Sequence, residues 1–150
     1  MKIAIGSDER THLTDMLIEE LQKRGHDLIL FGPLAADDPD ADWPQTSSKA
    51  AKAVAQGVAD EGIVCCWTGT GASIAANKVP GIRAALCHDA ETARGARIWN
   101  HANVLALSLR ATSEPMAKEI LDAWFATPYS EDEWNRQQIE RISQLEARHE

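Results

Sequence analysis

The sequence lacks the features that define several specialised classes of protein. Its three cysteines, two of them adjacent, form neither an even disulfide framework nor a zinc-binding spacing. No run approaches the roughly 18 apolar residues of a membrane-spanning helix, and the N-terminus has no signal-peptide core. The net charge of −8 argues against nucleic acid or an anionic membrane as partner. We therefore expect a cytoplasmic protein with free thiols.

The composition that remains is that of an ordinary globular protein. The chain has 150 residues, of which 44% are hydrophobic and 25% charged. Because no repeat or linker interrupts it, residues 1–150 are predicted to form a single domain. Short apolar runs typical of strands occur at residues 2–6, 27–31, 62–66, 83–87 and 103–108.

Helical patterns alternate with these runs. Apolar residues recur at helical spacing at Leu13, Met16, Leu17 and Leu21, then at Ala51, Val54, Ala55 and Val58, and again at Met116, Ile120, Leu121 and Trp124. Gly25 predicts the end of the first helix, and the acidic stretch 32–44 predicts a loop. From about Ser130 onward the apolar stripe is thin, so we expect the last helix to pack on a second subunit.

This alternation predicts an α/β fold: a three-layer, doubly wound (Rossmann-like) sheet of five parallel strands with helices on both faces. If the strand order is 2-1-3-4-5, it reverses between the first and third strands, and ligands bind beyond the carboxyl ends there. The residues that leave those strands are Ser7, Asp8 and Glu9, and the run CWTGTG at 66–71.

The second of these segments has the features of an anion-binding turn. Thr68, Gly69, Thr70 and Gly71 precede a helical run at 72–77, so backbone N–H groups and a helix N-terminus can meet negative charge there. Such a terminus favours an ionised thiol, which makes Cys66 a candidate base for abstracting a proton beside a carbonyl. The alternative is a tight turn with a buried cysteine. Neighbouring Cys65 is expected to face the opposite side and pack in the core.

Other chemistries find less support. The turn is neither a Walker A loop nor G-x-G-x-x-G, so a nucleotide-binding domain lacks its phosphate motif. No His, Asp and Glu cluster has metal-ligand spacing, and backbone donors need neither a metal nor a cofactor to stabilise an enediolate.

The run from 62 to 87, GIVCCWTGTGASIAANKVPGIRAALC, closely resembles the ribose-5-phosphate isomerase B and galactose-6-phosphate isomerase family. The resemblance extends from the opening IGSD at 5–8 to Trp124. It implies metal-free isomerisation of a sugar phosphate in a homodimer or tetramer with shared active sites. Cys66 matches the family's base, and residues 68–71 match its enediolate and phosphate loop. Asp8, Asn100 and Arg110 match substrate-binding positions.

Several departures from the family cluster at this site. Glu9 stands where the family usually has histidine, although one galactose-6-phosphate isomerase subunit type also has Asp-Glu there. The ring-opening histidine falls on Trp99; His101 is the nearest substitute, and a solvent-facing helix end is the simpler interpretation. Trp67 replaces a glycine, so the loop is expected to avoid positive φ there.

The phosphate clamp also departs from the family. Its two arginines fall near Trp134 and Gln138, leaving Arg136 within reach of the site and Arg141 further along the chain.

Trp67, Trp99 and Trp134 together suggest a reshaped pocket, because aromatic faces pack well on sugar C–H surfaces. An open-chain substrate such as a tetrose 4-phosphate would need no ring-opening acid, and an unphosphorylated sugar is a further alternative. A function of another class also stays open: a catalytically silent sugar-phosphate-binding protein with the same fold.

Overall fold

The computed structural model describes residues 1–148, and these form five strands, six α-helices and one short 3-10 helix. The strands are β1 (Lys2–Ser7), β2 (Asp27–Phe31), β3 (Glu61–Cys66), β4 (Ala84–Leu86) and β5 (Val104–Ser108). The helices are α1 (His12–Lys23), α2 (Trp43–Ala55), α3 (Thr70–Asn77), α4 (Ala90–Asn100), α5 (Glu114–Ala126) and α6 (Glu133–Ala147), and η1 (Gly32–Leu34) is the 3-10 helix. No helix within the described residues is long and apolar enough to cross a membrane.

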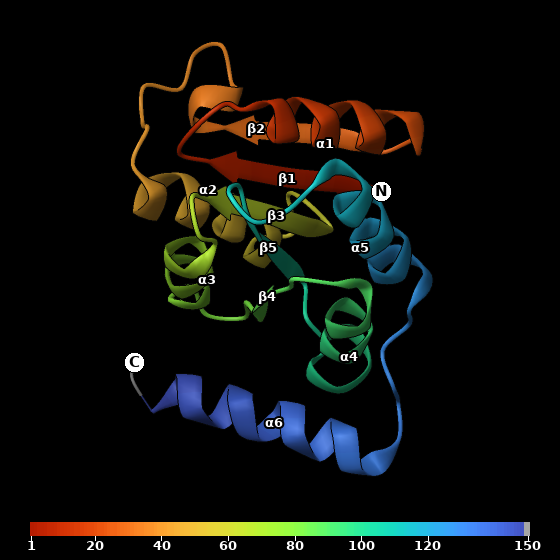
Figure 1. Ribbon diagram of the computed structural model, residues 1–150. Coiled ribbons are helices and arrows are strands. Elements are labelled where there is room, and N and C mark those ends of the chain that lie inside the picture. Colours follow the sequence, from red (N-terminus) through yellow and green to blue (C-terminus); the bar gives the residue numbers. More distant parts are fainter. Residues whose placement is uncertain (149–150) are drawn as a thin grey trace.

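The five strands form one parallel sheet in the order β2-β1-β3-β5-β4 (Figure 1). The expected order 2-1-3-4-5 was wrong in its last two positions. Every residue of β5 is buried, which suits the interior of a sheet, whereas β4 has three half-buried residues and suits an edge. The order still reverses between β1 and β3, as expected, and the three-layer α/β architecture is confirmed.

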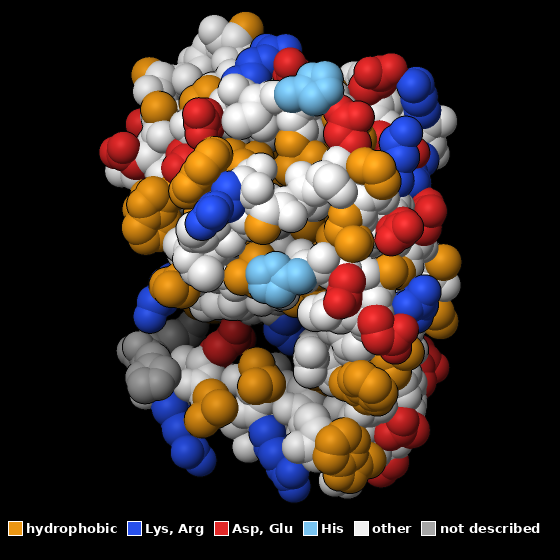
Figure 2. Space-filling view, viewed as in Figure 1, with side chains coloured by type: hydrophobic (Ala, Val, Ile, Leu, Met, Phe, Trp, Pro, Cys, Tyr) orange, Lys and Arg blue, Asp and Glu red, His pale blue; other side chains and the backbone are white. Residues whose placement is uncertain are grey.

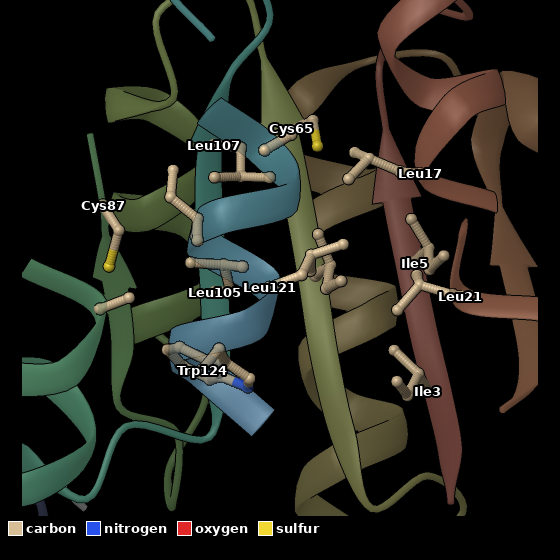
Figure 3. Close-up of a cluster of buried hydrophobic side chains, with 14 of the residues drawn as sticks. Ile3, Ile5, Leu17, Leu21, Cys65, Cys87, Leu105, Leu107, Leu121 and Trp124 are labelled. Carbon is tan, nitrogen blue, oxygen red and sulfur yellow. The ribbon is translucent and has the colours of Figure 1, made fainter. Parts of the chain in front are cut away.

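Helices cover both faces of the sheet. On one face α1, α4 and α5 enclose the larger core, where Ile5 of β1, Leu105 of β5 and Leu121 of α5 converge (Figure 3). On the other face α2 and α3 pack closely through small side chains. Because consecutive strand residues alternate sides, Cys65 lies in the first core and Cys66 in the second.

Two elements differ from their expected extent. Val58 lies beyond the end of α2 and is 52% exposed, because the chain turns at Gly57 with a φ of 72°. Helix α4 was missing from the sequence patterns. Its buried face consists of Ala93, Ala96 and Arg97, which produces little hydrophobic periodicity.

A buried ion pair joins β3 to α4 at the end of the sheet away from its carboxyl edge. Glu61 lies 2.9 Å from Arg97 and accepts a 2.7 Å hydrogen bond from the indole of Trp124. The Arg97 guanidinium also covers the Trp124 and Tyr129 rings, 4.9 and 4.5 Å from their centroids. The Tyr129 hydroxyl donates to Ala102 O. This network fixes α4 and the chain that leads to α6.

Helix α6 runs along the side of the molecule next to α3, β4 and α4 (Figure 1). It buries only Asn135, and its apolar residues Ile142 and Leu145 are 43% and 52% exposed. A groove of about 1110 Å³ lies between α6 and the rest of the chain, visible as a hollow above α6 (Figure 2). The thin apolar stripe of this helix is therefore unburied within one chain.

The acidic stretch between η1 and α2 is held by one basic side chain. Lys49 of α2 lies 2.6 Å from Asp38 and 2.6 Å from Asp40, and the Gly32 N–H donates to Asp38. Hydrogen bonds from Lys49 and then from the Gly32 and Asp40 backbone lower the pKa of Asp38 from 3.8 to about 2. The stretch predicted as a loop is thus fastened to the helix that follows it.

This contact predicts a pH-dependent contribution to stability. Because folding lowers the pKa of Asp38, its carboxylate stabilises the folded state above the ordinary value of 3.8, and the stabilisation is lost as the pH falls through about 2. We expect Asp38→Asn to be less stable than the wild type in urea unfolding at neutral pH. The difference should shrink below about pH 4. Asp37→Asn on the same stretch is the control and should leave stability unchanged; a constant Asp38→Asn deficit down to the lowest pH would contradict the assignment.

Candidate active site

The carboxyl ends of β1 and β3 lie side by side, with Ser7 in register with Cys65. The Ser7 hydroxyl braces the turn after β1, donating to Glu9 O at 2.6 Å and accepting from the Glu9 N–H at 3.3 Å. Asp8 follows directly, at the same edge of the sheet as Cys66. Its Oδ1 is buried without a hydrogen-bond partner among the described residues, and burial, with Glu9 adding to it, raises the pKa of Asp8.

Cys66 is the last residue of β3 and points toward the start of α3. Its thiol is 5% exposed, and the Ala72 N–H donates to its Sγ at 3.4 Å. Helix α3 begins at Thr70, two residues before the expected run at 72–77. The sulfur therefore lies at a helix N-terminus, where the first N–H groups have no partner within the helix.

The loop between β3 and α3 is fixed by the residues that end β5. Leu109 N–H donates to Cys66 O and Arg110 N–H to Trp67 O, both at 3.0 Å. The Ser108 hydroxyl also donates to Trp67 O at 3.0 Å. Within the loop the Thr68 and Thr70 hydroxyls are 2.7 Å apart. Predicted residues 8, 9, 66–71 and 110 thus gather at one edge of the sheet.

The loop uses a left-handed conformation at Gly69 alone. Gly69 has a φ of 78° and caps α3. A Cβ there would lie 2.6 Å from Leu86 Cδ1 and 2.9 Å from the Leu107 backbone carbon, so both conformation and space require glycine. Trp67 does not adopt a positive φ, as expected, and its side chain is 58% exposed beside Cys66.

The remaining predicted residues lie elsewhere in the chain. Trp99 and Asn100 end α4 and line the groove between α6 and the rest of the chain, together with Gln138. Trp134, 65% exposed, and Arg136, 3.7 Å from Glu131, lie near the start of α6. No residue of the Cys66 loop lines that groove. Within one chain the structure therefore does not bring the three tryptophans together, and a common pocket stays a prediction for an assembly of two chains.

His101 differs from its expected placement. His101 is half-buried at the end of α4 with a φ of 48°, and its Nε2 lies 2.7 Å from Ser130 O. Its ring stacks on Tyr129 with centroids 4.6 Å apart. The interpretation of a solvent-facing helix end was wrong, because this side chain anchors the approach to α6. Arg141 lines the groove and bonds Gln138 at 3.0 Å.

Sequence reasoning missed two residues of the site. Ser108 holds the Trp67 carbonyl, and Trp43, the first residue of α2, packs against Gly71. Neither lies in a motif. Ser108 is marked only by its place at the end of a buried strand, and Trp43 only by the Trp-Pro pair that starts a helix.

The other two cysteines lie in apolar surroundings. Burial raises the pKa of Cys65 and of Cys87 to about 12, so both are neutral thiols at physiological pH. Cys65 is completely buried, as expected of a core residue. Among residues 1–148 no three His, Cys, Asp or Glu side chains lie close enough to hold a metal ion.

The fold and this site define a class of enzyme. The model of the ribose/galactose isomerase family matches residues 3–144, and the chain belongs to that family. It is a sugar-phosphate isomerase, an enzyme that interconverts an aldose and a ketose.

Individual relatives match along nearly their whole length. Ribose-5-phosphate isomerase B of Escherichia coli is 39% identical over 98% of this chain and 97% of its own. D-erythrulose-4-phosphate isomerase of Pectobacterium atrosepticum is 35% identical over 97% of this chain and 95% of its own. The solved structure of ribose-5-phosphate isomerase B from Clostridium thermocellum has a TM-score of 0.91 at 39% identity and full coverage of both chains.

The geometry of Gly69 yields a prediction with a matched control. Gly69→Ala adds a left-handed alanine, which costs about 1–2 kcal/mol, and a clash with the Leu107 backbone. Gly57 has a similar φ of 72° with no atom within 4 Å of an added Cβ, so Gly57→Ala carries only the conformational cost. We expect Gly69→Ala to lose clearly more unfolding free energy in urea and to lose activity. Equal losses in the two variants would show that the loop has room to relax.

Proposed function

We propose that residues 1–150 act as one cytoplasmic isomerase domain that converts a sugar phosphate through a cis-enediolate, with Cys66 as the base. The observation that carries the proposal is the position of the Cys66 sulfur, 3.4 Å from the Ala72 N–H at the start of α3. An N–H donor and a helix N-terminus are the features that stabilise a thiolate. The same N-terminus offers donors to an oxyanion beside the sulfur.

The reaction moves one proton between two carbons. The Cys66 thiolate removes the C2 proton of the aldose, the C–H electron pair forms the C1–C2 double bond, and the carbonyl electrons move to O1. Backbone N–H groups of residues 67–71 stabilise the charge on the enediolate without a metal or cofactor. The thiol then returns its proton to C1, while the O2 proton passes to O1 and C2 becomes the ketose carbonyl. We assign the transfer of that oxygen-bound proton to the Thr68 hydroxyl, which is paired with Thr70.

The neighbouring residues bind the sugar. Asp8 presents a buried carboxyl oxygen that has no hydrogen-bond partner within residues 1–148, and this oxygen can accept a hydrogen bond from a sugar hydroxyl. Glu9 follows it, and Trp67 offers an exposed aromatic face. The backbone N–H of Arg110 is bonded to the loop and the residue is exposed, so we assign its guanidinium to an anionic group of the substrate.

The other residues of the predicted site reach it from a second copy of the chain. Trp99, Asn100, Trp134 and Arg136 are distant from the Cys66 loop in one chain and lie on or beside the unburied helix α6. A homodimer, alone or within a tetramer, covers the apolar residues of α6. It also brings these four residues to the Cys66 loop of the partner subunit. Two shared active sites result.

An open-chain substrate, a tetrose 4-phosphate, suits this site best. Trp99 occupies the position of the family's ring-opening histidine, and His101 is committed to Ser130. In a tetrose 4-phosphate the 4-hydroxyl is esterified and cannot close the usual five-membered ring, so no ring-opening acid is needed. A relative at 35% identity is an isomerase of D-erythrulose 4-phosphate.

The adjacent cysteines provide the test of the base. Cys66→Ala should lower kcat by roughly 10²- to 10⁴-fold, the usual contribution of a general base, and should abolish exchange of the substrate C2 proton with deuterated solvent in NMR spectra. Cys65→Ala is the control, because its thiol faces the opposite core; it should keep kcat within about threefold. The substrates are erythrose 4-phosphate, ribose 5-phosphate, a hexose 6-phosphate and the free sugars.

The outcomes separate the alternatives. Turnover of the tetrose phosphate above the others, lost only in Cys66→Ala, supports the proposal. Full activity in Cys66→Ala would remove Cys66 as the base. Thermal stabilisation by these sugars without turnover in the wild type would favour a silent binding protein. A preference for ribose 5-phosphate would overturn the open-chain substrate and leave the base unaffected.

Mixing two inactive variants tests the shared site. Cys66→Ala and Asn100→Ala should each be nearly inactive. In a mixed dimer, the Cys66 of one chain meets the Asn100 of the other, and one of its two sites is intact. An equimolar mixture after subunit exchange should therefore recover about a quarter of wild-type activity. No recovery, with exchange verified by mass spectrometry, would place both residues in the same chain's site.

A further inference from the structure

We propose that Trp43, at the start of α2, is a positioning residue that holds the anion-binding loop through its contact with Gly71. This rests on the proposed function, since the loop matters because it meets the enediolate. Trp43 is 42% exposed, so only part of its side chain packs against the rest of the protein.

A side chain at position 71 would press on the Trp43 indole. A Cβ on Gly71 would lie 3.0 Å from Trp43 Cε3 and 3.1 Å from Cδ2. Gly71 does not adopt a positive φ, so its backbone conformation is open to other residues. The indole therefore lies against the Gly71 backbone, and this close contact favours glycine at position 71.

Trp43 is itself held by a rigid support. A Cβ on Gly6 of β1 would lie 2.3 Å from Thr46 O, so the first turn of α2 sits directly on the end of β1. The Thr46 hydroxyl donates to Asp42 O at 3.2 Å. Lys49, within α2, forms ion pairs with Asp38 and Asp40 of the stretch that precedes the helix. The indole thus projects from a fixed helix end.

The position of Gly71 decides where the loop directs its donors. Gly71 lies in the first turn of α3, one residue before the Ala72 N–H that donates to Cys66 Sγ. A small shift of this turn moves both the donor to the sulfur and the N–H groups that meet the enediolate. Misplacement by about 1 Å can cost a hundredfold in rate.

Two substitutions at position 43 test this role. Trp43→Ala should lower kcat roughly tenfold to a hundredfold, with a smaller change in KM, because the N–H groups act on charge that develops in the transition state. Trp43→Phe keeps an aromatic ring over Gly71 and should retain kcat within about threefold. Val58→Ala, exposed just after α2, is the control with unchanged kinetics.

A double-mutant cycle tests the contact itself. Gly71→Ala should lower kcat in the wild type, because the new Cβ lies 3.0 Å from Trp43 Cε3 and pushes the indole aside by a few tenths of an ångström. It should cost much less in the Trp43→Ala background, where the space is free. The cycle is measured with the substrate that the wild type turns over best, and circular dichroism verifies folding. If Gly71→Ala does not fold, the comparison of Trp43→Ala with Trp43→Phe decides alone.

The outcomes are independent of those for Cys66. Unchanged kcat in Trp43→Ala, or an equal cost of Gly71→Ala in both backgrounds, overturns the role of Trp43. If either occurs in an enzyme that Cys66→Ala inactivates, only this inference fails. Full activity in Cys66→Ala would instead remove the proposed base, whatever the cycle shows.

Discussion

The central position of β3 is the constraint on which the site depends. β3 pairs with β1 on one side and with β5 on the other, so the ends of three strands distant in sequence meet at one edge. The hydrogen bonds continue past the strands, since the Cys66 and Trp67 carbonyls accept from the backbone after β5. The loop that we propose as the anion-binding site is thereby held through its own carbonyls, and its N–H groups stay available as donors.

The opposite end of the sheet has a different role. Glu61, Arg97 and Trp124 form a buried network that ties β3 to α4 and α5. A buried ion pair of this kind adds little net stability but is costly to break. Because Tyr129 and His101 extend it to the chain before α6, the network fixes where α6 starts. The helix with the thin apolar stripe thus projects from a fixed base toward the partner that we propose.

Much of the fold followed from the sequence, because strand periodicity and glycine positions are local signals. The opposite faces of Cys65 and Cys66, the adjacent carboxyl ends of β1 and β3 and the ordinary φ of Trp67 all depend on such signals. The order of β4 and β5 in the sheet could not be predicted from such signals, because it depends on which of the two strands is buried more completely. Trp43 was missed for a related reason: its contact with Gly71 joins two helices, and no local pattern records a close approach between them.

The loop also explains how the family's fold accommodates such large departures at its active site. Each position has a separate physical requirement: Gly69 must be left-handed and Gly71 must leave space for an indole. Position 67 has neither requirement, because its carbonyl alone is engaged while its side chain points outward. A tryptophan there changes the surface beside Cys66 without disturbing the donors. In the site that we propose, substrate preference can therefore change at position 67 and on α4 and α6, while Cys66 and the backbone donors of the loop keep their places.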